Sequence, residues 1–260
     1  MDFVETGESY DPPRLLVYAL PGFGKTTFAA SAPAPLVLQT EEGAAQIGAD
    51  RTPLAESFDQ VMDWLAQLYK SEQPKFKTIV IDSLDHLEPL IHKKVCEDQK
   101  VKSIEDISYG KGYIHALDYW RRVARGLDSL RKKHSMGVIM IAHHQVKAFH
   151  DPVAEDYDRY EMKLHKSASA FVQENADAVL FGKYRVFVRK EEKGFNNTTN
   201  KGQGNGERVL HTEERPGFVA KNRYNMPNEI TLPSFDGKPS AEDRQNVFGA
   251  VAQYIDYYQQ

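Results

Sequence analysis

The stretch that decides the fold is "RLLVYALPGFGKTTFA", residues 14–29. It opens with an apolar run typical of a buried strand, passes through a turn containing proline and glycine, and ends in a helical run. A strand, turn and helix in this order can direct backbone N–H groups at phosphate oxygens. The usual pattern, G-x-x-x-x-G-K-[ST], has glycine where this chain has Ala19. Because Ala19 ends the strand, we expect its methyl group to be tolerated.

Each part of this loop has an expected role. The Lys25 ammonium should reach the β and γ phosphates of a nucleotide, and the Thr26 hydroxyl should bind Mg²⁺. Gly22 and Gly24 suit a backbone that approaches a ligand closely. A chance Gly-Lys-Thr at the start of a helix is the alternative. The expected nucleotide-binding residues are Pro21, Gly22, Phe23, Gly24, Lys25, Thr26 and Thr27.

A second motif, "TIVIDSLDHL" at residues 78–87, places Asp82 at the end of an apolar strand. Ligands of parallel sheets gather at this edge, so we expect the Asp82 carboxylate to hold Mg²⁺ through water. Ser83 or Asp85 could support it. Alternatively, any of the three could cap the following helix, and both roles can coexist.

Two further strands end in polar residues that suit ATP hydrolysis. Glu41 and Glu42 follow the strand in "PLVLQTEEGA" (35–44), where a carboxylate could activate water; Glu41 is the better candidate, and a surface turn is the alternative. His143 and Gln145 end "GVIMIAHHQVK" (137–147) and share a face, where they could sense a γ-phosphate or serve a structural role. A metal site built from His143 and His144 is not expected, because adjacent strand residues point apart.

Apolar runs alternate with helical patterns along most of the chain. This alternation predicts an α/β fold with a mostly parallel, twisted sheet flanked by helices. Residues 183–214 read as an antiparallel hairpin with a flexible Gly/Asn-rich loop, which extends the sheet towards the C-terminus. The expected division is a tail (1–13), one ATPase domain (14–239) with a mobile loop at about 146–166, and a C-terminal helix (240–260). The apolar runs are 14–19, 35–40, 77–83, 136–144 and 176–182, and the clearest helical patterns are 57–71, 113–134 and 241–258.

Composition limits the classes of protein that remain. The 260 residues include a single cysteine, Cys96, so an internal disulfide or a zinc site built from cysteines is excluded. No apolar run is long enough to span a bilayer and the first residues are acidic, so we expect a cytoplasmic protein without membrane contact. The formal net charge is −4, yet residues 183–223 hold ten Lys/Arg against five Glu. That local excess of positive charge suits a nucleic acid.

Taken together, these motifs resemble the RecA-like ATPase core found in RecA, RadA and DnaB-type helicases. "PGFGKTT", "LQTEEG", "VIDSLDHL" and "IMIAHHQV" follow one another in that family's order. "FVAKNRYNMPNEITL" (218–232) is similar to a late strand of the family that carries cations into the ATP site of a neighbouring subunit. The resemblance therefore implies Mg²⁺-dependent ATP hydrolysis, an oligomer (ring or filament), and trans-acting roles for Lys221 and Arg223.

Within that family, the layout is similar to small bacteriophage ATPases of single-strand annealing and recombination, which would place the protein in a bacterial host. The resemblance implies single-stranded DNA as partner, and a single-strand-binding protein as a further one. Alternatives are a nucleotide-dependent switch that binds a protein, or a ring helicase motor. The acidic segment "AEDYDRYE" (154–161) would repel DNA unless it faces away. The cations expected to contact DNA are Lys147, Lys163, Lys166, Arg185, Arg189 and Lys190.

Overall fold

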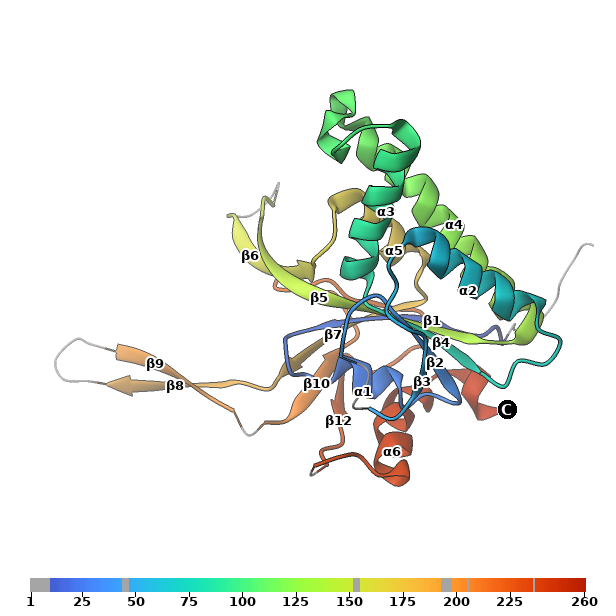
Figure 1. The fold of residues 1–260 in the computed structure, drawn as a ribbon. Coiled ribbons are helices and arrows are strands. Elements are labelled where there is room, and N and C mark those ends of the chain that lie inside the picture. Colours follow the sequence, from blue (N-terminus) through green and yellow to red (C-terminus); the bar gives the residue numbers. More distant parts are fainter. Residues whose placement is uncertain (1–9, 44–46, 152–154, 193–197, 205, 236) are drawn as a thin grey trace, which may run out of the picture.

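One large sheet forms the centre of the molecule, with helices on both faces (Figure 1). The computed structural model describes residues 10–43, 47–151, 155–192, 198–204, 206–235 and 237–260, and the side chains of these except 187–203. The strands are β1 (Arg14–Ala19), β2 (Pro35–Gln39), β3 (Asp50–Arg51), β4 (Thr78–Asp82), β5 (Gly137–Phe149), β6 (Tyr157–Met162), β7 (Ala178–Tyr184), β8 (Phe187–Glu192), β9 (Thr198–Gln203), β10 (Arg208–His211), β11 (Lys221–Asn222) and β12 (Glu229–Leu232). The helices are α1 (Lys25–Ala29), α2 (Phe58–Lys70), α3 (Leu84–Gln99), α4 (Lys111–His134), α5 (Lys166–Asn175) and α6 (Ala241–Ala252).

The strand order is β12-β10-β7-β1-β5-β4-β2-β3, with β11 beside β7 and β6 beside β5. The pairs from β7 to β3 are parallel, and β10, β11 and β12 add antiparallel pairs at one side. This arrangement confirms the predicted α/β class, a mostly parallel sheet with an antiparallel C-terminal extension. The strand β5 lies between β1 and β4, so the ends of β1, β5 and β4 are neighbours at one edge.

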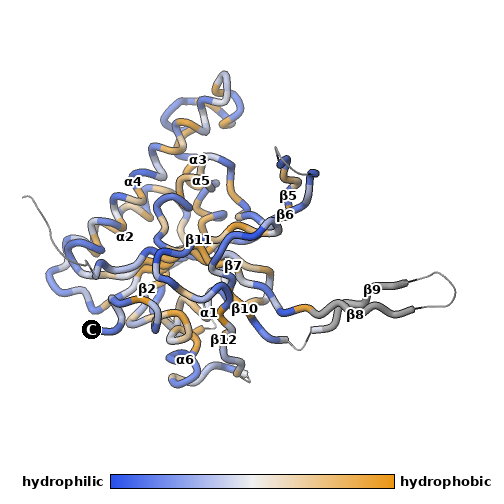
Figure 2. Tube along the Cα trace, turned by 180° about the vertical axis from the view of Figure 1, so that it is seen from behind, coloured by the Kyte–Doolittle hydropathy of each residue, from blue (hydrophilic) through white to orange (hydrophobic). Residues whose placement is uncertain are grey.

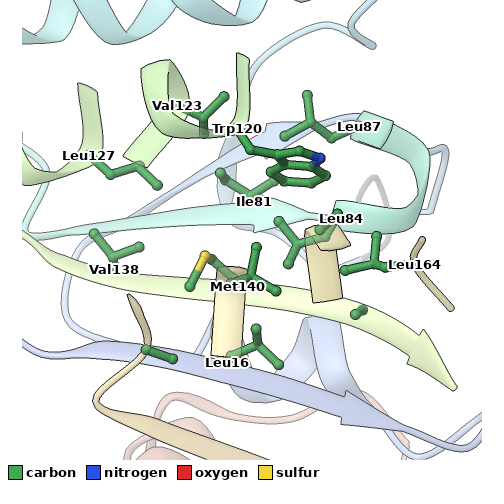
Figure 3. Close-up of a cluster of buried hydrophobic side chains, with 14 of the residues drawn as sticks. Leu16, Ile81, Leu84, Leu87, Trp120, Val123, Leu127, Val138, Met140 and Leu164 are labelled. Atoms are coloured by element: carbon green, nitrogen blue, oxygen red, sulfur yellow. The ribbon is translucent and has the colours of Figure 1, made fainter. Parts of the chain in front are cut away.

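Side chains of β1 alternate between the two faces of the sheet, so the core has two layers. Leu16 and Tyr18 of β1 face α2–α5, whereas Leu15 and Val17 face α1 and α6. In the first layer, Trp120 of α4 lies over the sheet together with side chains from α3, β4 and β5 (Figure 3). Both faces of the parallel strands are thus covered, which explains their continuous apolar sequences.

The long helix α4 shows one difference from its sequence pattern. Trp120, Val123 and Leu127, which follow one another at helical spacing, are buried, whereas Ile114, six residues before Trp120, is 60% exposed and Ala116 is buried in its place. The first turn of α4 packs against the short helix around Ile104, where an added Cβ at Gly112 would lie 2.5 Å from the Ile104 carbonyl oxygen. This close approach turns Ile114 towards solvent.

Two antiparallel ribbons project from the same side of the sheet (Figure 1, Figure 2). Residues 146–166, expected as a loop, instead hold the end of β5 paired with β6, followed by the start of α5. In its described part the expected loop is therefore a ribbon of two strands, held by backbone hydrogen bonds and by Arg159 stacked over Phe149. Such a ribbon leaves no apolar run in the sequence.

The second ribbon lies within residues 183–214. The return strand was predicted correctly, since β10 pairs with β7, but the Gly/Asn-rich segment also contains β9, paired with β8. Arg185 donates its backbone N–H to the Glu207 carbonyl (2.8 Å), which continues the pairing between the two ladders. Because β9 is polar throughout, its sequence shows no strand alternation. Among the described residues, no helix combines the length and apolar character needed to cross a membrane.

Candidate functional site

The loop between β1 and α1 has the backbone geometry of a phosphate-binding loop. Gly22 and Gly24 adopt positive φ angles of 73° and 94°, which favour glycine. The first helical hydrogen bond runs from the Phe28 N–H to the Gly24 carbonyl (2.9 Å). The amides of residues 25–27 therefore have no partner within the helix and can donate to an anion.

A glycine on the neighbouring strand accommodates Ala19, the departure from the consensus loop. Ala19 is fully buried and pairs with Gly182 of β7. A Cβ at Gly182 would lie 2.8 Å from the Ala19 Cβ and 2.6 Å from the Phe23 ring, closer than real Cβ atoms come. The missing side chain at Gly182 thus provides the space that Ala19 and Phe23 fill.

Lys25 and Asp82 are two buried charges at this edge of the sheet. Lys25 is 8% exposed, and burial lowers the pKa of its ammonium, opposed by the carboxylates of Glu41 and Asp82. Asp82 is 3% exposed, and burial raises the pKa of its carboxyl, opposed by a hydrogen bond from Thr26. Each shift reflects a charge removed from water without full compensation.

These residues fit a Mg²⁺ ion. The buried Asp82 Oδ1 has no hydrogen-bond partner within the described part of the chain, and the Thr26 hydroxyl lies beside the same carboxylate. Oxygen donors of this kind, completed by phosphate oxygens and water, are the ligands that Mg²⁺ prefers. Residues Thr26 and Asp82 are therefore the pair that would hold it.

Glu41 faces the loop from the end of β2, whereas Glu42 is exposed. Its Oε2 accepts a hydrogen bond from the Ser83 hydroxyl (2.9 Å) and lies 2.6 Å from the His86 Nδ1. The backbone N–H groups of Thr40 and Glu41 both donate to the Asp82 carbonyl (2.8 and 3.2 Å). Parallel pairing of β2 with β4 thus fixes Glu41 beside Asp82.

His143 joins this group through Asp85. The Asp85 carboxylate accepts the backbone N–H of His143 and contacts its Nδ1, both at 2.8 Å. Burial would raise the pKa of Asp85, but these bonds from His143 hold it at about 2, and the Asp85 carboxylate in turn raises the pKa of His143. Ser83 occupies the N-cap position of α3 without a side-chain capping bond. The Asp85 carboxylate in the first turn of α3 bonds to His143 of β5.

Gln145, predicted to share the sensing role, is engaged elsewhere. Its side-chain amide donates to the Met162 carbonyl of β6 at 2.7 Å. The neighbouring His144 is partly buried, which lowers its pKa, and its ring lies 5.6 Å from that of Tyr160. His143 is therefore the strand-end residue that lies with Glu41 and Asp85.

Lys221 and Arg223 lie at the other edge of the sheet. The strand β11 pairs with the beginning of β7, whereas the phosphate loop follows the end of β1. The Lys221 ammonium donates to three carbonyls at the end of α5, those of residues 173, 174 and 176, at 2.7–3.0 Å. The more exposed Arg223 contacts Asp177 at 3.4 Å. Within one chain, neither cation belongs to the phosphate site.

The cations expected to contact DNA are dispersed. Lys147 and Lys166 both lower the pKa of His165, secondary to its burial. Lys163 is exposed at the end of β6. Arg185 is paired with Glu207 and Glu229, at 3.2 and 3.1 Å. The side chains of Arg189 and Lys190 lie outside the described residues.

Two residues that contact the phosphate loop escaped sequence analysis. The Tyr184 hydroxyl donates to the Gly22 carbonyl (2.7 Å), and the Arg208 Nη1 lies 3.5 Å from the Phe23 carbonyl oxygen. They face one another across the β7–β10 pair. The motif analysis gave no signal for either, because both reach the loop through strand pairing. His86 was missed as well, although its position one turn into the helix after Asp82 could have suggested it.

Comparison with known proteins places the chain in a family. The model of the AAA domain family matches residues 11–224. The chain belongs to the AAA domain family. It is a nucleotide-binding P-loop protein of the ATPase class, which confirms the coarser part of the resemblance to RecA-like ATPases, while the closeness to bacteriophage proteins stays a prediction.

Other comparisons are more distant. A crystal structure of a RadB recombinase has 13% sequence identity and a TM-score of 0.47, covering 91% of this chain and 90% of that one. No curated protein matches the sequence.

Proposed function

We propose that this AAA domain protein binds ATP with Mg²⁺ and hydrolyses it at the edge formed by β1, β4 and β5. The observation that supports this most directly is the partnerless, buried Asp82 Oδ1 next to Lys25 and Thr26. An uncompensated buried carboxylate is costly, and a bound ion removes that cost. Burial of Lys25 similarly favours an anionic ligand against its ammonium.

The side chains divide the chemistry between them. Amides of the loop and Lys25 bind the phosphates. Glu41 accepts the proton of the attacking water, and the Ser83 hydroxyl orients the Glu41 carboxylate. His143, held by Asp85, donates towards the terminal phosphate as charge develops there. Bound Mg²⁺ supplies charge neutralisation at the phosphate oxygens.

Binding of a fluorescent ATP analogue tests this proposal. We expect binding with Mg²⁺ to be tight in the wild type and weakened in Asp82→Asn, because the amide removes the charge that holds the ion. Asp156→Asn, on the exposed β5–β6 ribbon, is the matched control. Equal Mg²⁺ dependence in both variants would contradict the metal role of Asp82.

We further propose that single-stranded DNA is the partner, as part of recombination or annealing. A cavity of about 570 Å³ lies between β6 and the end of β7, and its lining includes Tyr160, Lys183, Tyr184 and Arg185. Rings and cations of this kind stack bases and bind phosphates. Against this, residues 146–166 carry five acidic and four basic side chains. That acidic β5–β6 ribbon favours the second candidate, a nucleotide-dependent switch that docks a protein.

The ATPase rate with and without an oligonucleotide separates the two candidates. Stimulation that fades as salt rises supports DNA binding, since phosphate contacts release counterions. Lys147→Glu combined with Lys166→Glu should remove the stimulation, whereas Lys75→Glu, an exposed cation at the start of β4, should leave it intact. An ATPase indifferent to DNA at every salt concentration supports the protein-docking switch.

An oligomer that completes the site in trans is the last element of the proposal. Arg223 is the stronger candidate, because its side chain is 55% exposed and Lys221 already has three carbonyl partners. Arg223→Ala should slow hydrolysis, and wild-type chains should partly rescue it in mixed oligomers. An equal defect in a strictly monomeric sample would contradict the trans role.

A further inference from the structure

Four side chains from three elements converge beside the phosphate loop, at the ends of β2 and β5 and on the first turn of α3. Glu41, Asp85, His86 and His143 each offer one ligand atom, and these atoms lie within 4.8 Å of one another. Two of them are imidazole nitrogens and two are carboxylate oxygens. Asp82, the expected Mg²⁺ ligand, is not part of this group.

The separations between the donor atoms match those around a small cation. The His86 Nδ1 lies 2.6 Å from the Glu41 Oε2 and 3.3 Å from the Asp85 Oδ2. The His143 Nδ1 lies 2.8 Å from the Asp85 Oδ2 and 3.6 Å from the Glu41 Oε2. Ligands about 2.0 Å from a tetrahedral Zn²⁺ are roughly 3.3 Å apart, so small side-chain shifts would suffice.

The chemistry of the group selects the kind of ion. Two carboxylates balance the charge of a divalent cation, and each Nδ1 binds a metal only as an unprotonated nitrogen. Two imidazoles favour Zn²⁺, Co²⁺, Ni²⁺ or Cu²⁺ over Mg²⁺ and Ca²⁺, which prefer oxygen alone.

Neighbouring groups already orient the two carboxylates. The Asp85 Oδ1 accepts the His143 backbone N–H (2.8 Å), and the Glu41 Oε2 accepts the Ser83 hydroxyl (2.9 Å). Such outer hydrogen bonds are typical supports of metal ligands. The His86 side chain is 48% exposed and the Asp85 side chain 3%, so the group opens to solvent on the His86 side.

We infer that Glu41, Asp85, His86 and His143 form a site for a transition-metal dication of the Zn²⁺ class. A bound ion would withdraw Glu41 from water activation and so inhibit hydrolysis. The inhibition rests on the proposed role of Glu41, whereas binding of the ion does not.

Cobalt is a suitable probe for the site, because it shares the ligands of Zn²⁺ and absorbs visible light when it is held by protein ligands. The full-length chain, stripped with a chelator and free of nucleotide, is titrated with Co²⁺. We expect the absorption to saturate near one equivalent and Zn²⁺ to displace it. His86→Gln should weaken binding by more than about tenfold. His92→Gln, the same change two turns further along α3, should not.

A second arm measures hydrolysis with Mg²⁺-ATP, with and without one equivalent of Zn²⁺. The wild type should lose about 100-fold in rate when the site is filled, the scale of a lost general base, whereas the rate of His86→Gln with Zn²⁺ should equal that variant's own rate without Zn²⁺. Equal Co²⁺ binding by wild type and His86→Gln, or no absorption at all, overturns the site. If Co²⁺ binds but Zn²⁺ does not inhibit the wild type more than His86→Gln, the metal site stands and the inhibition through Glu41 is rejected. A chain without ATPase activity in Mg²⁺-ATP buffer free of Zn²⁺ contradicts the proposed function, while Co²⁺ absorption still tests the metal site.

Discussion

The two edges of the sheet both gather charges, but they satisfy them differently. At the ends of β1 and β4, Lys25 and Asp82 are buried and Asp82 keeps a carboxylate oxygen without a partner in the described residues. At the opposite edge, Lys221 has three carbonyl partners and Arg223 contacts Asp177. A bound ligand would stabilise the buried, incompletely paired charges at the first edge. At the second edge, Lys221 and Arg223 already have partners within the chain.

Replacing a lysine at each edge gives the largest contrast. Lys25→Ala should lower ATP affinity by about 100-fold, because charge-assisted bonds to the phosphates are lost. Lys221→Ala should leave ATP affinity unchanged and instead cost about 1–2 kcal/mol of folding free energy, since three carbonyls at the end of α5 lose their donor. Titration with an ATP analogue and chemical denaturation measure the two effects. Equal ATP affinities in the two variants would remove the distinction between the edges.

Replacing adjacent glutamates sharpens the description of the first edge. Glu41→Gln should bind ATP normally but lower kcat by about 100-fold, because the amide cannot accept the proton of water. The exposed Glu42, changed to Gln, is the control and should retain the wild-type rate. Phosphate release under saturating ATP measures both. Normal turnover by Glu41→Gln would assign the base to another residue.

Acid should lower the free energy of unfolding through His211, in the antiparallel part of the sheet, more than through the phosphate site. Burial lowers the pKa of His211 to about 4, with Lys183, Arg185 and Arg215 adding to the shift and Glu229 opposing it. The unfolded chain binds this proton near pH 6.5 and the folded chain near pH 4, so protons favour unfolding in between. The contribution of His211 is complete above pH 6.5, and roughly 2–3 kcal/mol should be lost as the pH falls to 4.

His211→Phe is the variant for this measurement, because a ring beside Phe218 (4.5 Å between centroids) keeps its packing and loses its titration. Denaturation at pH 7 and pH 4.5 should show a smaller loss in the variant than in the wild type. The same loss in both proteins would mean that His211 carries no part of the acid sensitivity.

The smallest expected effect concerns the glycine behind the phosphate loop. Gly182→Ala should cost about 1–3 kcal/mol, because the new methyl group meets Ala19 and Phe23. Gly249→Ala in α6 has open space around the new Cβ and should stabilise the chain slightly. Thermal unfolding of both variants compares the sites. A neutral Gly182→Ala would show that Phe23 moves without cost.

The sequence was sufficient where the position of a residue depends on a single strand. Lys25, Thr26 and Asp82 could be predicted because each stands at a fixed place relative to one buried strand, and parallel strands bring their ends together. Glu41 was preferred over Glu42 by the same counting, and the structure turns only Glu41 inward.

Prediction failed where a residue depends on a distant partner. Sequence analysis could not assign Lys221 to the carbonyls of α5, Gln145 to the Met162 carbonyl, or Arg208 to the phosphate loop, because each contact joins elements that only the sheet order brings together. The β5–β6 ribbon and the strand β9 were missed for another reason: their pairing rests on backbone hydrogen bonds, and β9 is polar throughout.

The pair of Tyr184 and Arg208 connects the β8–β9 ribbon to the phosphate loop. These two residues are the last of β7 and the first of β10, so they form the base from which the ribbon extends, and both contact carbonyls of the phosphate loop. A displacement of the ribbon base would therefore move both the ring and the guanidinium that contact the loop.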